Sequence, residues 1–225
     1  MTADEPAPAP QEGFEAFAAL AAHQLGEAVA LMRGAARVLQ AERAGLGPAA
    51  GDALRALTAG GERAQRYIDD LLDVSRGAAP VPAGASAELD AALDAAAAEL
   101  HPFIARAGAQ LQREPLPRAP LAPRDAERLF THLLRSALAA GARRMLLAGS
   151  ATPGGVTVEM LDDGEPAAPG SDPFASFARP RGRGALIGAG VSLPVCGQIV
   201  GRYGGDIAMV TRDDGATLVT IRLDD

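Results

Sequence analysis

Two segments with apolar residues at alternating steps of three and four constrain the fold of this chain most. In the first segment these small or apolar residues are Phe14, Phe17, Ala21, Leu25, Ala28, Met32, Ala35 and Leu39. In the second they are Leu54, Leu57, Gly61, Ala64, Ile68 and Leu71. Because this spacing follows the turn of an α-helix, each set forms one stripe along a helix face. We therefore predict helices over residues 12–42 and 49–76, each with a buried stripe.

The segment that separates the two helices, Arg43-Ala44-Gly45-Leu46-Gly47-Pro48, is a short Gly/Pro turn. Two long helices joined in this way form an antiparallel hairpin. A lone hairpin buries little apolar surface, so we expect two copies of the chain to pair into a dimeric four-helix bundle. Packing of the hairpin on the C-terminal part of its own chain is the alternative.

The rest of the chain mixes helical and strand patterns. Residues 77–86 are a linker rich in Pro, Gly and Ala, and residues 87–225 form a second domain. Its expected helices cover residues 87–107, 123–140 and 191–203, and a Pro- and Gly-rich loop covers residues 165–184. Its expected strands lie near Gln110, near Arg118, and over residues 144–149, 156–161, 206–212 and 216–223. Strand pairs mixed with helices favour an α/β sandwich, so the whole chain is of the α+β class.

Composition excludes several classes of function. The 225 residues carry a net charge of -7 and no block rich in Lys or Arg, which excludes a nucleic-acid footprint. Residues 1–11 are acidic and rich in Pro and Ala, which indicates a disordered tail rather than a signal peptide. The longest apolar stretch, residues 185–200, contains Gly, Ser and Pro and cannot serve as a membrane span. The single cysteine, Cys196, lies there and is typical of a core residue in a reducing cytosol.

His23 is the residue of the first helix that stands out chemically. It lies about 200° round the helix from Ala21 and Leu25, so it points away from the apolar stripe. Its neighbours one turn away are Ala19 and Glu27, one small and one acidic. A solvent-facing imidazole beside a carboxylate, on a helix otherwise built for packing, indicates a group kept for chemistry. For a single residue, an inert surface histidine is the alternative.

With these features in order, the chain resembles the catalytic core of two-component sensor histidine kinases over about residues 14–223. The segment His23-Gln24-Leu25-Gly26-Glu27-Ala28 is similar to the phosphoacceptor box of that family. The end of the hairpin, residues 67–76, looks most like that of the bacteriophytochrome-type kinases. The resemblance implies that His23 accepts the phosphoryl group and that Glu27 orients its ring or holds its proton. Gln24 stands where the family has an acid, and Ala28 where it has a proline.

A second box, His132-Leu133-Leu134-Arg135-Ser136-Ala137, resembles the family's Asn-Leu-x-x-Asn-Ala, whose second asparagine holds the magnesium that bridges the ATP phosphates. Both asparagines are absent. Magnesium prefers near-octahedral oxygen ligands, and Ser136 offers one short-reaching oxygen while His132 is a poor ligand. Arg135 either contacts phosphate directly or belongs to a solvated helix face. The resemblance therefore implies a doubtful magnesium site and weak or absent ATP binding.

Two further motifs resemble the adenine and phosphate boxes of the ATP-binding domain. In Asp162-Asp163-Gly164-Glu165-Pro166, Asp162 matches the carboxylate that accepts the adenine amino hydrogen, and Gly164 matches the glycine beside the base. Pro166 replaces a second glycine. Phe174 matches a phenylalanine at the start of the lid. The loop Gly188-Ala189-Gly190 precedes a helix, where backbone N–H groups make an anion site.

The resemblance implies a dimerisation and phosphoacceptor hairpin followed by a domain of the histidine kinase and Hsp90-like ATPase class. It implies a phosphorelay protein in which His23 passes a phosphoryl group to or from an aspartate of a response-regulator receiver domain. Impaired use of ATP follows from the missing asparagines. An ATP-independent histidine phosphotransferase or a pseudokinase scaffold that binds a receiver domain is the alternative. Expected partners are a second copy of the chain, a receiver domain and a separate sensor or kinase, in the cytoplasm and without membrane or nucleic acid.

Overall fold

The structure is a computed structural model that describes residues 10–41, 47–75, 81–168, 170–174 and 192–224. In the first helix it describes the side chains from Leu25 onward, and in the second helix some of those up to Ile68. The chain divides into two compact units, Met1–Arg76 and Gly77–Asp225. Within the described residues, none of the helices combines the length and the apolar character that crossing a membrane requires.

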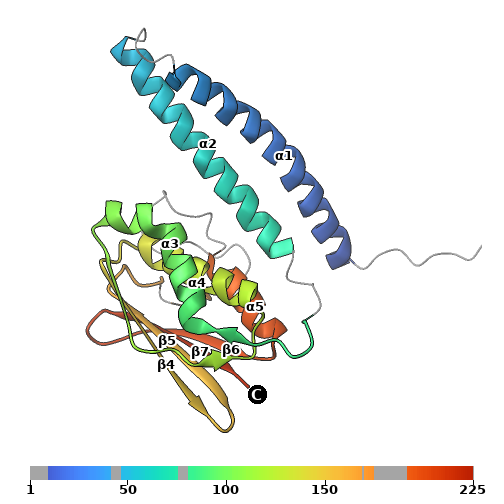
Figure 1. Cartoon of the computed structure of the whole chain (residues 1–225), viewed down its shortest axis with the longest axis vertical. Helices are drawn as coiled ribbons and strands as arrows, with labels where there is room; N and C mark the ends of the chain where they lie inside the picture. Colours follow the sequence, from blue (N-terminus) through green and yellow to red (C-terminus); the bar gives the residue numbers. More distant parts are fainter. Residues whose placement is uncertain (1–9, 42–46, 76–80, 169, 175–191, 225) are drawn as a thin grey trace, which may run out of the picture. The chain divides into compact units, whose positions relative to one another are not determined.

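The first unit is an antiparallel pair of helices, α1 (Pro10–Ala41) and α2 (Pro48–Ser75) (Figure 1). Both predicted helices are confirmed, with ends shifted by at most two residues. Gln40 Nε2 donates a hydrogen bond of 3.2 Å to Thr58 Oγ1. Further along, a Cβ atom on Gly61 would lie 3.0 Å from Cγ of Arg33, and one on Gly26 would lie 3.8 Å from Cγ2 of Ile68. The glycines therefore let the two helices approach closely.

The helices contact one another through residues spaced by seven positions in α1 and by fourteen in α2. In α1 these are Val29 and Ala36, and in α2 Leu54 and Ile68, all 6% exposed or less. The predicted stripe of α1 is therefore not the one that α2 covers. Four of the residues predicted in the stripes remain 45–53% exposed in the single chain: Leu25, Met32, Leu39 and Leu57. In α1 they lie about 40° or more round the helix from Val29 and Ala36, so one apolar stripe is covered and its neighbour is open.

The second unit contains a five-stranded mixed sheet in the order β2-β4-β5-β7-β6. The only parallel pair in this order is β2 with β4, and the other three pairs are antiparallel. The bounds are β2 (Gln110–Arg113), β4 (Arg144–Thr152), β5 (Gly155–Asp162), β6 (Asp206–Thr211) and β7 (Thr217–Leu223). A separate antiparallel ribbon pairs β1 (Ala87–Glu88) with β3 (Arg118–Ala119).

Three helices cover one face of this sheet: α3 (Leu89–Ala107), α4 (Pro123–Ala139) and α5 (Ser192–Arg202) (Figure 1). Every predicted helix and strand of this unit is present, and the predicted fold class is confirmed. The helix predicted over residues 87–107 begins at Leu89, because residues 87 and 88 pair with β3 as strand β1. The helix α4 packs against both α3 and α5. As a result, every residue from Leu129 to Leu138 is buried.

Alternation along the strands decides which side chains face the helices. In β5 the buried side chains are those of Val156, Val158, Met160 and Asp162, and these residues pair with Leu223, Ile221, Val219 and Thr217 of β7. The inward row is thus apolar until its last pair, which is polar. Cys196 of α5 is fully buried, as its sequence context predicts, with Sγ 3.8 Å from the carbonyl oxygen of Leu129. Burial raises the pKa of its thiol.

Candidate functional site

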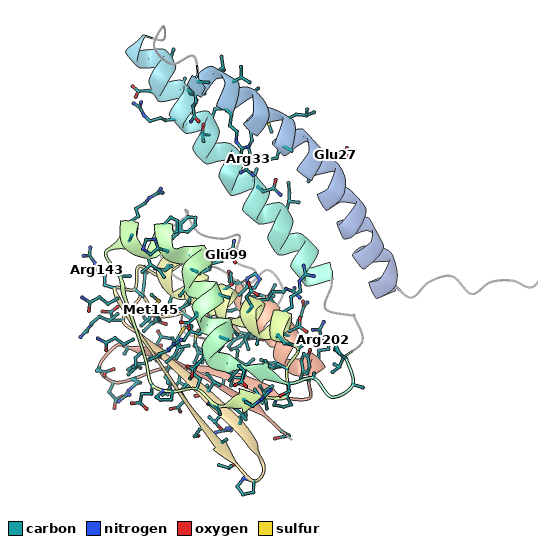
Figure 2. All side chains as sticks on the ribbon, viewed as in Figure 1. Glu27, Arg33, Glu99, Arg143, Met145 and Arg202 are labelled. Carbon is teal, nitrogen blue, oxygen red and sulfur yellow. The ribbon has the colours of Figure 1, made fainter. Side chains whose placement is uncertain are left out.

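Of the predicted phosphoacceptor pair, the structure describes the Glu27 side chain. His23 belongs to α1, but its side chain lies outside the described residues, so its predicted orientation remains a prediction. Glu27 follows His23 by one helical turn and is exposed (Figure 2). It lies about 200° round the helix from Val29, which faces α2. The carboxylate is therefore on the side of the hairpin that a partner could reach.

Asp162 ends β5 in the interior of the second unit, with 1% of its surface exposed. Its Oδ1 accepts a hydrogen bond of 2.9 Å from the backbone N–H of Gly164. A Cβ atom on Gly164 would lie 2.8 Å from Cβ of Ala140 and 2.9 Å from Asp162 Oδ1. Only glycine therefore fits here, because the turn after β5 is pressed against the C-terminal end of α4.

The second acid of the Asp-Asp-Gly box has a structural role. Asp163 Oδ1 accepts hydrogen bonds from the backbone N–H groups of Arg143 at 2.7 Å and Arg144 at 2.9 Å. Its Oδ2 accepts one from Arg144 Nε at 3.0 Å. Burial opposes the charge, but these hydrogen bonds, those of Arg144 first, lower the pKa of the Asp163 carboxyl to about 2. Asp163 thus fixes the start of β4, and Asp162 is the acid that lies inside.

Thr217 is a candidate site residue that sequence reasoning missed. It is fully buried and is the register partner of Asp162 across the β5–β7 pair. The two therefore place a hydroxyl and a carboxyl side by side at one end of the sheet. Its position in the alternating pattern of the strand could have identified it. Thr217 falls on the buried side of β7, where the other residues, Val219, Ile221 and Leu223, are apolar.

The prediction that Arg135 belongs to a solvated face of α4 is wrong. His132 is 1% exposed, Arg135 6% and Ser136 7%. The reason is the position of α4 between α3 and α5, which covers its polar side as well as its apolar side. Arg135 is therefore a buried cation, and of the two predicted roles only a contact with phosphate stays a prediction.

The far end of α4 joins this box to the Asp162 turn. The backbone N–H of Glu165 donates a hydrogen bond of 2.8 Å to the carbonyl oxygen of Ala140. Ser136 lies one helical turn before Ala140, and its carbonyl accepts the Ala140 N–H at 3.0 Å. The structure therefore brings together two sequence-predicted groups, the box on α4 and the Asp162–Gly164 turn.

Phe174 adds a third element to this region. Its side chain is half-buried and lies against Gly197 of α5, where a Cβ atom would be 3.5 Å from Cβ of Phe174. The start of the predicted lid is thus packed on α5. The lid residues that follow Phe174, up to Gly184, and the glycine loop with Gly188 and Gly190 lie outside the described residues.

A buried polar cluster holds the N-terminal turn of α4 to the end of α5. Asp125 pairs with Arg202, labelled in Figure 2, and with Arg128 at 3.3 Å. Tyr203 donates its hydroxyl hydrogen to Asp125 Oδ2 at 2.6 Å and accepts one from the backbone N–H of Ala122 at 3.1 Å. Burial, followed by the hydrogen bond to Asp125, raises the pKa of the Tyr203 hydroxyl. This cluster was not predicted, because its members come from elements about 80 residues apart.

The donors at the α4 box do not fit a magnesium ion. Magnesium needs several oxygen ligands, preferably carboxylate or amide. Here Ser136 supplies one hydroxyl, and its chain neighbour Arg135 is a buried permanent cation. Within the part of the chain that the structure describes, no group of three or more His, Cys, Asp or Glu side chains could hold a metal ion.

The first unit matches a known domain family. Residues 15–80 match the family described as the His Kinase A (phospho-acceptor) domain, a range that includes His23. No curated protein matches the chain.

Solved structures of histidine kinases share the fold. Full-length ShkA in complex with AMPPNP has a TM-score of 0.71 and 20% identity over 92% of this chain, which spans 45% of the length of ShkA. The Acinetobacter baumannii histidine kinase AdeS has a TM-score of 0.60 and 15% identity, covering 90% of this chain and 97% of AdeS. The mycobacterial sensor histidine kinase MprB has a TM-score of 0.51 and 17% identity, covering 62% of this chain and 95% of MprB. Residues 15–80 are therefore a histidine kinase phosphoacceptor domain, and the chain has the fold of a sensor histidine kinase core.

Proposed function

We propose that this chain is a phosphotransfer protein of the histidine kinase class that acts in the cytoplasm. His23 accepts a phosphoryl group and exchanges it with an aspartate of a response-regulator receiver domain. The observation that supports this most is the match of residues 15–80 to a phosphoacceptor domain, with His23 one helical turn from the exposed Glu27.

The chemistry needs few protein groups. A ring nitrogen of His23 attacks the phosphorus, a nitrogen–phosphorus bond forms, and the bond from phosphorus to the aspartyl oxygen breaks. The aspartate leaves as a carboxylate with the bonding electron pair, and the reverse step returns the phosphoryl group. A hydrogen bond from the other ring nitrogen to Glu27 holds the proton that the attacking imidazole keeps. Transfer of this kind depends on positioning and charge more than on covalent chemistry by the protein.

The functional form in this proposal is a homodimer. The open stripe, defined as Leu25, Met32 and Leu39 of α1 with Leu57 of α2, is 45–53% exposed in the single chain. Its seven-residue spacing in α1 matches that of the covered stripe, so a second hairpin can pack on it in the same way. Two hairpins joined there form a four-helix bundle. A separate sensor or kinase then supplies the signal.

Transfer from ATP to His23 is slow or absent in this proposal. The α4 box lacks the family's metal-binding asparagine, and a phosphoryl donor depends on metal to neutralise its developing charge. The histidine kept at position 23, inside the matched phosphoacceptor range, favours the second candidate function, an ATP-independent histidine phosphotransferase, over a pseudokinase scaffold. ShkA was crystallised with AMPPNP, which indicates that the shared fold can hold a nucleotide.

The test is to incubate the purified chain with ³²P-labelled receiver domains that have been charged with acetyl phosphate, and separately with labelled ATP. We expect acid-labile label on the wild-type chain from a receiver, and little from ATP. His23→Ala should abolish the label. His101→Ala is the matched control, because His101 is an exposed histidine on α3, and it should label normally. Label that persists in H23A, or no label from any receiver or from ATP, would overturn the proposal.

A further inference from the structure

Five of the polar residues of α4 form a stripe along the helix. At about 100° per residue they fall within a sector of roughly 100°. Four of them are 9% exposed or less, and Arg128 is part-buried with 17% of its side chain exposed. The members of this polar stripe are Asp125, Arg128, His132, Arg135 and Ser136.

The first half of the polar stripe is occupied by other parts of the chain. Asp125 receives Arg202, Arg128 and the Tyr203 hydroxyl, so its carboxylate is held by two cations and one neutral donor. Arg135 lies seven residues after Arg128, only about 20° away round the helix. The two arginines therefore occupy the same side of α4.

The second half of the polar stripe lies toward the start of α5. The contacts of Asp125 with Arg202 and of Leu129 with Cys196 run in opposite order along the two helices, so α4 and α5 are antiparallel. Because the two helices are antiparallel, Arg135 and Ser136, which follow Leu129 along α4, lie toward the N-terminal end of α5. The same end of α4 contacts the Gly164 turn through Ala140.

The charge at this position is the opposite of what a metal site needs. Bringing a divalent cation beside a buried, permanently charged guanidinium costs free energy, and Ser136 alone cannot compensate for the lost water ligands. A guanidinium binds phosphate oxygens directly, often through two parallel hydrogen bonds. Arg135 thus supplies, as a fixed cation, the charge that a metal would otherwise bring.

We propose that this chain binds the phosphates of an adenine nucleotide without a metal ion, with Arg135 in place of magnesium. The inference rests on the proposed function, since it takes the second unit as the nucleotide-binding half of a histidine kinase core. Asp162 binds the base and Arg135 the phosphates. Because no metal neutralises the transferring group, the nucleotide is a ligand of this unit and a poor phosphoryl donor.

Calorimetry of the full chain with ATP, in excess EDTA and in excess magnesium, tests the metal independence directly. We expect the two Kd values to agree within about threefold, because neither Asp162 nor Arg135 binds the nucleotide through magnesium. Across adenosine, ADP and ATP in EDTA, affinity should rise with the number of phosphates. A magnesium requirement greater than about tenfold, or no binding of ATP in either buffer, would overturn the inference.

Variants test the role of Arg135. Arg135→Gln should weaken ATP binding in EDTA by about tenfold or more, the effect of a lost charge-assisted hydrogen bond, and leave adenosine binding unchanged. Arg124→Gln is the matched control, because Arg124 is an exposed arginine of the same helix and should bind as the wild type does. Arg135→Lys keeps the charge and should lie between them, and circular dichroism checks the folding of each variant. Equal ATP affinity in R135Q and wild type would overturn the assignment.

The outcome is independent of the proposed function. Transfer from a charged receiver to His23 is measured on the same preparations and needs no nucleotide. Receiver-dependent labelling of His23 with no ATP binding would remove this inference and keep the phosphotransfer proposal. Metal-free ATP binding with no labelling of His23 would do the reverse.

Discussion

The two units of the chain differ in how much of their apolar surface the chain itself covers. In the hairpin, Val29 and Ile68 are buried, while Leu25 and Met32 beside them remain about half exposed. In the second unit, ten consecutive residues of α4 are buried, polar ones included. The hairpin keeps the histidine of its predicted phosphoacceptor box, with Gln24 and Ala28 as departures from the family pattern, and the second unit lacks both asparagines of its box on α4.

This contrast indicates that the hairpin needs further helices to cover its apolar surface, whereas the second unit has a core of its own. A helix pair that covers one of two adjacent apolar stripes is complete only when another helix covers the second. A sheet covered by three helices has its own core and tolerates the loss of site residues, because packing and chemistry use different side chains. The substitutions at His132 and Ser136 therefore alter the site without disturbing the fold.

The largest expected effect comes from a charge in the open stripe. Leu25→Glu should dissociate the dimer, because an unpaired carboxylate buried in each half of the interface costs several kcal/mol, about 3–5. Light scattering of the full chain at tens of micromolar, an order typical of homodimer affinities, measures this. Leu31→Glu is the control, since Leu31 is 76% exposed and lies about 160° from the α2-facing side. A dimeric L25E variant would show that the open stripe is not an interface.

The second prediction concerns the polar cluster that joins α4 to α5. Asp125→Asn should lower the free energy of unfolding by about 3 kcal/mol, since it leaves the part-buried Arg202 and Arg128 without their carboxylate. Urea denaturation followed by circular dichroism measures the change. Asp214→Asn serves as the control, because its pair with Arg212 is exposed and 3.9 Å long, and it should change stability by well under about 1 kcal/mol. Equal stabilities of the two variants would mean that the second unit does not depend on this cluster.

The third prediction addresses the tight packing at the end of α4. Gly164→Ala should cost about 1–3 kcal/mol, because the new methyl group would sit 2.8 Å from Cβ of Ala140. Gly154→Ala is a matched control with no neighbour within 4 Å of its added Cβ. Thermal unfolding of both variants distinguishes crowding from a general effect of losing a glycine. If G164A and G154A have the same melting temperature, the turn after β5 can shift to accept a methyl group. The second unit would then be less tightly packed than the burial of α4 indicates.

Much of this organisation could be predicted from the sequence. Periods of 3.6 and 2 residues, interrupted by Gly and Pro, locate every described helix and every described strand except β1, since those periods reflect local geometry. The two residues of β1 were predicted as the first turn of a helix. The hairpin face was shifted by about 40°, because small and apolar residues adjoin one another on α1 and only packing decides which of them α2 covers. The residues of α1 that α2 covers are Val29 and Ala36.

The misses in the second unit depend on contacts between distant elements. Arg135 is buried because α4 lies between α3 and α5, which no local pattern shows. Thr217 acquires its place from its pairing with Asp162, 55 positions earlier in the chain. The assignments at His23, Gly188 and Gly190 stay predictions, because their side chains or loops lie outside the described residues.

The smallest expected effect is a dependence of stability on pH through Asp163. Its pKa is lowered from 3.8 to about 2 in the folded chain, so its charge stabilises the fold fully above pH 3.8 and loses that contribution as the pH falls toward 2. The side chain is 30% exposed and its partner Arg144 80%, so screening reduces the effect to about 1 kcal/mol. Asp163→Asn should therefore be less stable than wild type at pH 6, and the difference should shrink between pH 4 and pH 2. Urea midpoints at pH 6, 4, 3 and 2.5 measure it, and Asp172→Asn, which alters an exposed turn, is the control. A stability difference that stays constant down to pH 2.5 would show that the hydrogen bonds of Asp163 to Arg143 and Arg144 stabilise the fold without a contribution from the carboxylate charge.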